Sequence, residues 1–345
     1  HPPRELAFDL TPLWELLADD SVQKVVHAGE VDFEHVTQFI DKAPANVFDT
    51  QIADGFINTD FPLSLENLIA RYLDVQLPKA LTFTRWDQRP LSDVHVHYAV
   101  DDVRYLLAIR QMLIEKLEQV GRAAWVREEF EQLTDIDRYR FDARAIARRL
   151  RRVHNVPLRH RRLLLRYVVM RDRIARKRDL PPRSIIRDKL LVELAKDAPS
   201  SMDKLRKVRG LPAKVTEAHG LQFIHAAQKA RGRNQWQNPT EPRRPLPAPQ
   251  RKRVDEAWRR LKHDCEAMSL SFGLVTSRKQ FADLATSLLR HGKLPDDHPL
   301  LRGWRKPIIA AALETLRDRG GLSRHAAVGA SVATATTAPL VSFVP

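Results

Sequence analysis

The secondary-structure pattern changes once along the 345 residues, at about Gly121, and this change constrains the fold most. Before Gly121, two short apolar segments, Lys24–Gly29 and Asn46–Gln51, have the length and composition of buried strands. Helical segments at Val31–Ile40 and Ser64–Leu73 follow them in alternation. After Gly121 the pattern is helical throughout. The sequence therefore predicts an α/β domain with a partly parallel sheet, followed by all-α domains.

Charge divides the chain at nearly the same place. Residues 1–136 contain 12 Lys and Arg against 24 Asp and Glu, a net charge of −12, whereas residues 137–345 contain 46 against 19, a net charge of +27. This asymmetry indicates an acidic part that handles cations and a basic part that binds a polyanion. Nucleic acid is the favoured polyanion, because counterion release rewards clustered Lys and Arg. The alternative is a basic, solvated surface without a partner.

Other features of the composition limit the location of the chain. The single cysteine, Cys265, excludes an intrachain disulfide and a Cys-rich zinc site, and it suits a reducing compartment such as the cytoplasm. Residues 1–20 lack the pattern of a signal peptide, and no apolar stretch has the length of a membrane span. We therefore expect a cytoplasmic chain that does not associate with membranes.

One helical segment near residue 100 has the residues of a reaction centre. Tyr98 and Asp102 are four residues apart, so both side chains emerge on one side of a helix, one turn apart. A metal-assisted hydrolase could use such a pair, the carboxylate to hold a cation and the phenol to orient an attacking water. The alternative is a surface pair that arose by chance. Four apolar residues are spaced for the buried face of this helix: Leu91, Ala99, Val103 and Leu106.

Three stretches, taken in order, resemble ribonuclease D, a family of 3′–5′ exoribonucleases in the DEDD superfamily. They are HAGEVDF (His27–Phe33), NVFDTQIADGF (Asn46–Phe56) and TRWDQRPLSDVHVHYAVDDVRYLL (Thr84–Leu107). Downstream, Arg159–Arg231 resembles the helicase-and-ribonuclease-D C-terminal (HRDC) module, and the GWR around Trp304 resembles a second one. The fold implied is a partial ribonuclease H-like α/β exonuclease domain followed by all-α HRDC-like domains.

The resemblance also implies the catalytic residues. The family binds two divalent cations through carboxylates, which gives Asp32 and Asp102 as metal ligands and catalytic residues and Tyr98 as the residue that orients water. Hard carboxylate oxygens favour Mg²⁺ or Mn²⁺ over softer metals. We interpret His27 and Asp49 as structural residues.

The family's first motif, Asp-x-Glu on the opening strand, is absent from this sequence. The chain corresponds to the family from about the third strand of the sheet, so the expected explanations are an N-terminally truncated fragment or a decayed activity. The absence of an initial Met favours a fragment. The functional alternative is a catalytically incomplete nucleic-acid-binding protein.

Two groups of residues are candidates for RNA contact. Lys79, Arg85 and Trp86 precede the third motif, where they could contact a phosphate and a terminal base; alternatively, Trp86 only packs this loop. The densest basic run supplies the second group, although a solvated helix face is the usual explanation for such a run. Its members are Arg148, Arg149, Arg152, Arg161 and Arg162.

These observations predict the following domain organisation. Residues 1–136 form the C-terminal portion of an exonuclease domain, 155–233 an HRDC domain, 234–253 a Pro-rich linker, 254–320 a second HRDC-like domain and 321–345 a disordered tail. Similar turns at Arg209–Gly210 and Arg302–Gly303 indicate a weak internal duplication. The expected function is hydrolysis of RNA 3′ ends, including precursors of transfer RNA, by a cytoplasmic monomer that releases nucleoside 5′-monophosphates.

Overall fold

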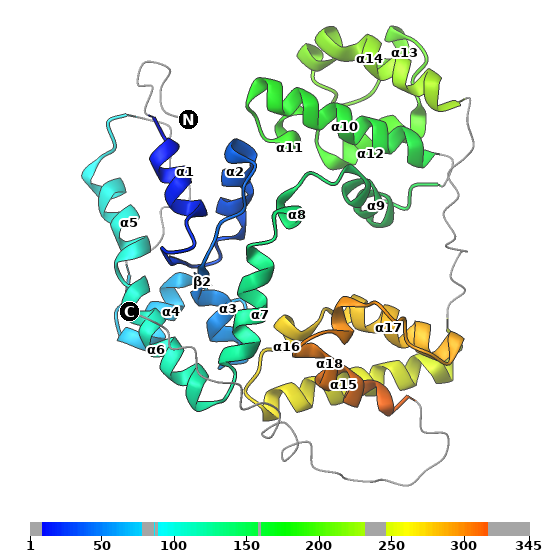
Figure 1. Ribbon diagram of the computed structural model, residues 1–345. Helices are drawn as coiled ribbons and strands as arrows, with labels where there is room; N and C mark the ends of the chain where they lie inside the picture. Colours follow the sequence, from blue (N-terminus) through cyan, green and yellow to red (C-terminus); the bar gives the residue numbers. More distant parts are fainter. Residues whose placement is uncertain (1–8, 78–85, 87–88, 158–159, 232–245, 317–345) are drawn as a thin grey trace. The chain divides into compact units, whose positions relative to one another are not determined.

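The computed structural model describes residues 9–77, 86, 89–157, 160–231 and 246–316 (Figure 1). The chain forms two compact units. The first unit combines residues 1–140 with residues 245–345, and the second comprises residues 141–244. The predicted disordered tail, 321–345, lies outside the described residues. No helix in the described ranges is both long and apolar enough to cross a lipid bilayer.

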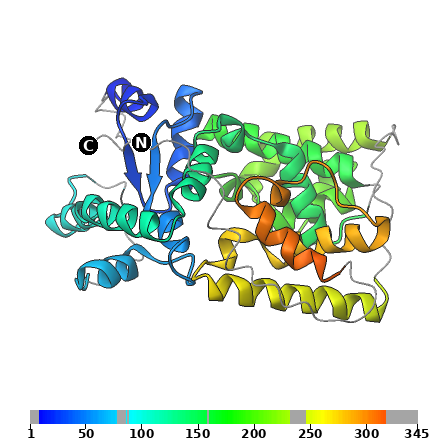
Figure 2. The same ribbon diagram turned by 60° about the horizontal axis from the view of Figure 1, so that its bottom comes forward.

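The N-terminal part of the first unit is α/β, as predicted. Its strands, β1 (Lys24–Val26) and β2 (Val47–Asp49), pair in parallel, with Lys24 opposite Val47 and Val26 opposite Asp49. Figure 2 shows both arrows pointing the same way. The helices of this part are α1 (Thr11–Ala18), α2 (Glu30–Ile40), α3 (Thr50–Gly55), α4 (Leu65–Leu73), α5 (Asp93–Arg104), α6 (Leu106–Gln119), α7 (Ala123–Leu133) and α8 (Ile136–Tyr139).

Asp49 stabilises the end of the sheet through hydrogen bonds to its carboxylate. The residue is 1% exposed, and its carboxylate accepts hydrogen bonds from four backbone N–H groups. Two of them, on Gln51 (2.9 Å) and Ile52 (3.3 Å), open α3, and the other two, on Ala28 (3.2 Å) and Gly29 (3.1 Å), lie beyond the neighbouring strand. The Asp49 side chain therefore caps α3 and connects the segments that follow the two strands. This agrees with the interpretation of Asp49 as a structural residue.

We expect Asp49→Ala to lower the free energy of unfolding of the first unit by about 2–3 kcal/mol, because four N–H groups lose their acceptor in a buried place. Urea unfolding of the full chain, followed by far-ultraviolet circular dichroism, measures this loss. Glu66→Ala on the exposed side of α4 is the control and should change stability by less than about 0.5 kcal/mol. Equal stability of the Asp49→Ala variant and the wild type would contradict this role.

The second unit is entirely helical in its described residues. Its helices are α9 (Ala143–Val153), α10 (Arg161–Arg178), α11 (Pro182–Ile185), α12 (Asp188–Asp197), α13 (Met202–Arg206) and α14 (Ala213–Arg231). Ala147 and Leu150 of α9 belong to the same buried cluster as Leu164, Tyr167 and Phe223. The compact unit therefore begins before residue 155, where the predicted HRDC domain starts, because α9 supplies part of its core.

The C-terminal helical block consists of α15 (Ala248–Ala267), α16 (Phe272–Val275), α17 (Arg278–His291), the 3₁₀ helix η2 (Pro299–Leu301) and α18 (Arg305–Glu314). The predicted linker, 234–253, extends too far at its C-terminal end, because α15 already begins at Ala248, and residues 234–245 lie outside the described residues. Pro247 is the N-cap of α15 and Pro249 lies in its first turn. Proline is tolerated there, because the first N–H groups of a helix have no hydrogen-bond acceptor within the helix. The prolines there begin a helix instead of extending a linker.

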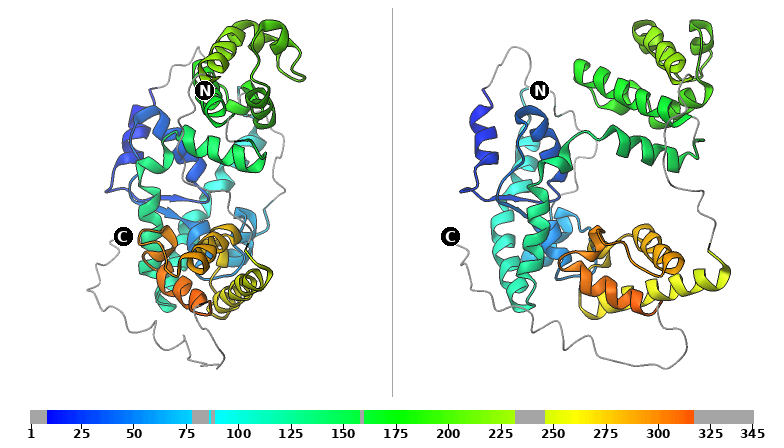
Figure 3. Two further views of the ribbon diagram at one scale, coloured as in Figure 1. Left: turned by 90° about the vertical axis from the view of Figure 1, so that its right-hand side faces the viewer. Right: turned by 45° about the vertical axis from the view of Figure 1, so that its right-hand side comes forward.

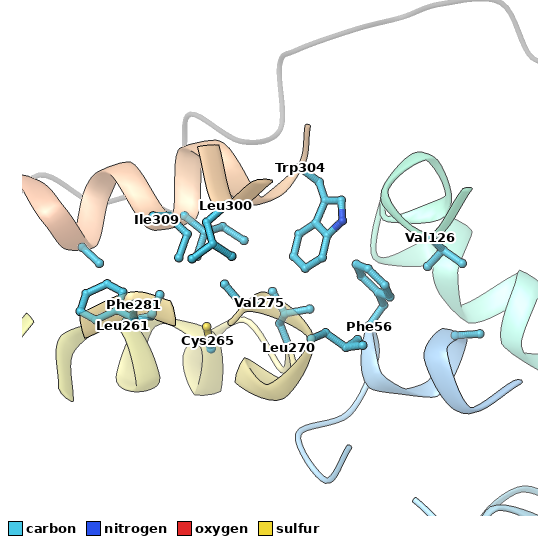
Figure 4. Packing of buried hydrophobic residues seen from close by; sticks show 14 of the residues in the cluster. Phe56, Val126, Leu261, Cys265, Leu270, Val275, Phe281, Leu300, Trp304 and Ile309 are labelled. Atoms are coloured by element: carbon cyan, nitrogen blue, oxygen red, sulfur yellow. The ribbon is translucent and has the colours of Figure 1, made fainter. Parts of the chain in front are cut away.

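This C-terminal block shares one hydrophobic core with the α/β part. Phe56, Leu113 and Val126 belong to the same buried cluster as Phe281 and Trp304. Figure 4 shows the Phe56 ring facing the Trp304 indole, and their ring centroids are 4.8 Å apart. In Figure 3 the helices of the block lie against those of the α/β part. The sequence did not predict this, since it placed the two in separate domains.

Two buried side-chain groups reinforce the junction. The Arg122 guanidinium donates to the carbonyl oxygens of Phe56, Met268 and Ser269, so it joins the α/β part to the segment after α15. On α7, Glu129 pairs with Arg305, which also donates to the Leu274 carbonyl oxygen at 2.8 Å. Local sequence gave no signal for these contacts, because Arg122 lies 66 to 147 residues from its acceptors and Glu129 lies 176 residues from Arg305.

The two predicted turns have similar backbones. Gly210 has a φ of +85° and Gly303 a φ of +49°, in the left-handed region that favours glycine. Helix α14 follows the first turn and α18 follows the second, so both turns precede the last described helix of their block. This similarity is consistent with the weak duplication inferred from sequence.

Candidate active site

Helix α5 carries the two central candidates, Tyr98 and Asp102. Both side chains are half-buried. Burial and the nearby charge of Asp102 raise the pKa of the Tyr98 phenol, and burial together with the charge of Asp101 raises the pKa of the Asp102 carboxyl. The Asp102 carboxylate is therefore near enough for its charge to act on the Tyr98 phenol, in agreement with their four-residue spacing on one helix. The phenol remains protonated at neutral pH and can donate or accept a hydrogen bond.

Trp86 lies against the same helix. Its ring centroid is 5.8 Å from that of Tyr98 and 5.3 Å from that of His95. The indole is still 40% exposed, so it both packs on α5 and presents surface to solvent. This arrangement agrees with the packing alternative and leaves a face on which a base could stack. Lys79 and Arg85, the other two candidates of this loop, lie outside the described residues.

The predicted buried face of this helix is wrong. No residue of α5 is buried: Ala99 is exposed, Val103 is 59% exposed, and Leu91 lies before the helix begins. Of the four predicted residues only Leu106 is buried. It belongs to α6, because the helix is interrupted at Tyr105, between α5 and α6. Apolar periodicity identifies a helix face, but burial requires another element to cover it, and no described element covers this one.

Asp32 lies in the first turn of α2 and is exposed. Its position near a helix N-terminus is favourable for a carboxylate whether or not it binds a metal. Asp32 and Asp102 have the hard oxygen donors that suit Mg²⁺ or Mn²⁺. However, no three His, Cys, Asp or Glu side chains come together as a metal-binding group within the described ranges. The described residues therefore supply single carboxylates and not a complete metal centre.

His27 follows β1 and has a structural environment. Its Nε2 lies 3.0 Å from the Leu63 carbonyl oxygen, and its Nδ1 lies 3.0 Å from the Thr50 hydroxyl oxygen. Burial is the main reason that the pKa of His27 is lowered, which favours the neutral ring. With both nitrogens engaged by protein groups, His27 holds the loop before α4 against the sheet, in agreement with its predicted structural role.

A cavity of about 340 Å³ opens beside β2, between α6 and α7, and its walls are mainly apolar. Phe48, Ile114, Val126 and Phe130 form much of its lining. None of Asp32, Trp86, Tyr98 and Asp102 takes part in it. The candidate catalytic residues thus lie outside this cavity, Asp32 on α2 and Tyr98 and Asp102 on α5.

The basic candidates lie in the second unit, on α9 and at the start of α10. Arg148 and Arg149 are exposed, Arg161 and Arg162 are half-buried, and Arg152 is on α9. Arg148 approaches Asp142 at 3.6 Å, with both side chains more than half exposed, so their pairing is weak. The buried Ala147 and Leu150 occupy another side of α9, which leaves Arg148 and Arg149 toward solvent.

Comparison with known proteins identifies the regions that contain these residues. A family model described as a 3′-5′ exonuclease matches residues 4–118, and a model of the HRDC domain matches residues 161–226. The first match contains all three catalytic candidates, and the second contains Arg161 and Arg162. The alternative of a catalytically incomplete nucleic-acid-binding protein is not favoured by these matches.

Several similar proteins are ribonucleases D. That of Gluconacetobacter diazotrophicus is 32% identical over 319 residues, which are 90% of this chain and 78% of the relative. That of Granulibacter bethesdensis is also 32% identical, with the same coverage of both chains.

A solved structure extends the similarity to the fold. The crystal structure of Escherichia coli RNase D, described as an exoribonuclease involved in structured RNA processing, is 26% identical with a TM-score of 0.74. The match covers 90% of this chain and 82% of the Escherichia coli chain. With an exonuclease region followed by an HRDC region, and with 32% identity to ribonucleases D over most of their length, the chain belongs to the ribonuclease D family of 3′–5′ exoribonucleases.

Proposed function

We propose that this chain supplies the Tyr98–Asp102 pair to a reaction that hydrolyses the terminal phosphodiester of RNA and releases nucleoside 5′-monophosphates. The observation that carries the proposal is the position of the two side chains one turn apart on α5, inside the region that matches the exonuclease family. Structured RNA, with precursors of transfer RNA foremost, is the proposed substrate. The proposed setting is a monomer in the cytoplasm.

Each candidate has a distinct role in this proposal. Asp32 and Asp102 contribute carboxylates to the binding of divalent cations, for which Mg²⁺ or Mn²⁺ is the proposed identity. Tyr98 orients the attacking water through its hydroxyl, which the raised pKa keeps protonated. Trp86 offers its exposed face to the terminal base, with Lys79 and Arg85 near the phosphates. Arg148, Arg149, Arg152, Arg161 and Arg162 contact the RNA backbone.

A 3′-exonuclease assay tests the role of Tyr98. The full chain is incubated with 5′-labelled RNA, either a transfer RNA precursor or an unstructured strand, with Mg²⁺, with Mn²⁺ or with chelator. We expect stepwise shortening that requires the metal. Tyr98→Phe should slow it by about 10²-fold, because the variant keeps the ring beside Trp86 and removes only the hydroxyl that orients the water.

Tyr105→Phe is the matched control, since Tyr105 begins the break between α5 and α6 and is not a candidate. Its rate should equal that of the wild type. An unchanged rate for Tyr98→Phe would remove Tyr98 from the mechanism. Internal cleavage products in place of a ladder would contradict exonuclease action.

A further inference from the structure

Helix α8 packs against α2, the helix that carries Asp32. In α8, Tyr139 is 7% exposed and belongs to a small buried cluster with Phe33 of α2 and Leu133 of α7. The Tyr139 and Phe33 rings meet edge to face, with their centroids 6.4 Å apart. The Tyr139 hydroxyl also donates to the Leu133 carbonyl oxygen at 2.8 Å. Tyr139 therefore fixes α8 between the end of α7 and the beginning of α2.

An ion pair joins α8 to the first turn of α2. The Arg138 Nε lies 2.8 Å from a Glu30 carboxylate oxygen, and the Arg138 side chain is 36% exposed. Because partly exposed ion pairs contribute little to stability, the chain should still fold without this one. Glu30 and Phe33 are three residues apart, so they lie on the same side of α2, and α8 contacts both.

The sheet holds the same turn of α2 through Gly29, the N-cap of this helix. The Gly29 N–H donates to the Asp49 carboxylate at 3.1 Å. A Cβ at Gly29 would lie 2.8 Å from Cγ2 of Val26 in β1, so α2 begins in close contact with the strand. Contacts with β1 and α8 together fix the rotation of α2 about its axis. Asp32 lies about 200° around this axis from Glu30, so the exposed carboxylate is on the side away from α8.

We propose that Arg138 and Tyr139 are positioning residues for the metal site, because they hold the first turn of α2 in the rotation that presents the Asp32 carboxylate to a divalent cation. The proposal rests on the proposed function in one respect, the metal role of Asp32. Both residues act through α2, by way of Glu30 and Phe33. Local sequence gave no signal for this role, since Arg138 is 108 residues from Glu30.

Hydrogen–deuterium exchange of the full chain tests this proposal without RNA and without turnover. Mass spectrometry follows peptides that cover residues 28–37, first in chelator and then over a series of MnCl₂ concentrations. The main variant is Arg138→Gln. The matched control is Arg140→Gln, which removes the charge of the C-cap of α8. Arg140 pairs with Asp137 at 2.7 Å and lies 3.9 Å from Asp41, at the far end of α2.

In chelator, we expect these peptides to exchange about threefold faster in Arg138→Gln than in the wild type, as the loss of one partly exposed ion pair requires. The control should exchange at the wild-type rate. Arg138→Lys, which keeps the charge, should recover most of the protection. Far-ultraviolet circular dichroism should be the same for all variants.

With MnCl₂, exchange in the wild-type peptides should slow, and Asp32→Asn should abolish this effect. The MnCl₂ concentration at its midpoint should rise about tenfold in Arg138→Gln, within the range found when residues that support a metal ligand are replaced. The direction of the shift separates positioning from charge. If α2 kept its orientation, removal of a positive charge would strengthen cation binding and lower the midpoint, as Arg140→Gln should do slightly or not at all.

Two results would overturn the proposal. One is exchange in chelator that is the same in Arg138→Gln and the wild type. The other is a MnCl₂ midpoint that is unchanged or lowered in Arg138→Gln. A wild-type chain whose peptides do not respond to MnCl₂ would instead overturn the metal role of Asp32, and this inference with it. The response of the wild type thus distinguishes a failure of the proposed function from a failure of the positioning role.

Discussion

Asp102→Asn is expected to reduce the rate of 3′-exonuclease shortening by about 10³-fold or more while leaving RNA affinity nearly unchanged. Asparagine has the shape of aspartate but no charge, so it removes the carboxylate proposed to hold a divalent cation. Removing a carboxylate that binds a metal ion weakens transition-state stabilisation by several kcal/mol. Each 1.4 kcal/mol corresponds to about a tenfold change in rate. Single-turnover assays with saturating enzyme measure the chemical step directly.

The neighbouring carboxylate provides the control. Asp101 is on the same helix, is also half-buried, and pairs with Arg104 at 3.4 Å. Asp101→Asn removes one negative charge from the same region and should alter the rate by less than about tenfold. Binding of RNA in chelator should be the same for both variants. If Asp102→Asn retained wild-type turnover, or if Asp101→Asn lost as much, Asp102 would have no specific role.

Glu129→Ala is expected to lower the free energy of unfolding of the first unit by about 3–5 kcal/mol, the usual cost of removing one partner of a buried ion pair. The Glu129 residue is 8% exposed. Its carboxylate accepts from the Trp304 indole N–H at 2.8 Å and from both terminal nitrogens of Arg305, one of them at 2.8 Å. The substitution leaves the half-buried Arg305 guanidinium without its carboxylate partner and the buried Trp304 indole N–H without its acceptor.

Urea unfolding measures the loss, and limited proteolysis shows where it acts, since cleavage should increase in the C-terminal block. Glu131→Ala, an exposed position two residues further along α7, should be nearly neutral. The double variant Glu129→Leu/Arg305→Met should recover much of the stability, because it replaces the pair by apolar groups instead of leaving one charge alone. A loss below about 1 kcal/mol for Glu129→Ala would mean that the pair does not hold the block in place.

Local patterns were enough to predict the secondary structure around the candidate site. The strands at Lys24–Val26 and Val47–Asp49 and the helix that carries Tyr98 and Asp102 lie where the sequence predicted them. Short-range rules decide such elements, since strand composition, helix periodicity and capping act over a few residues. The first turn of α15 was missed because prolines in a linker and prolines that begin a helix look alike in sequence.

Burial and charge pairing needed the tertiary structure. The apolar side of α5 has the spacing of a buried face, yet Val103 is 59% exposed, because spacing does not specify what covers a helix. Likewise, Glu129 and Arg305 are 176 residues apart, and no local pattern relates them.

The sequence by itself determined the α/β-then-helical order, the family resemblance, the spacing of Tyr98 and Asp102 and the division into acidic and basic parts. Only the tertiary structure decided that the C-terminal block shares a core with the α/β part and that Arg122, Glu129 and Arg305 form polar contacts across this junction. The physical reason is that hydrophobic periodicity and net charge can be read directly from the residues of one segment. Desolvation and ion pairing depend instead on which distant residues folding brings into contact.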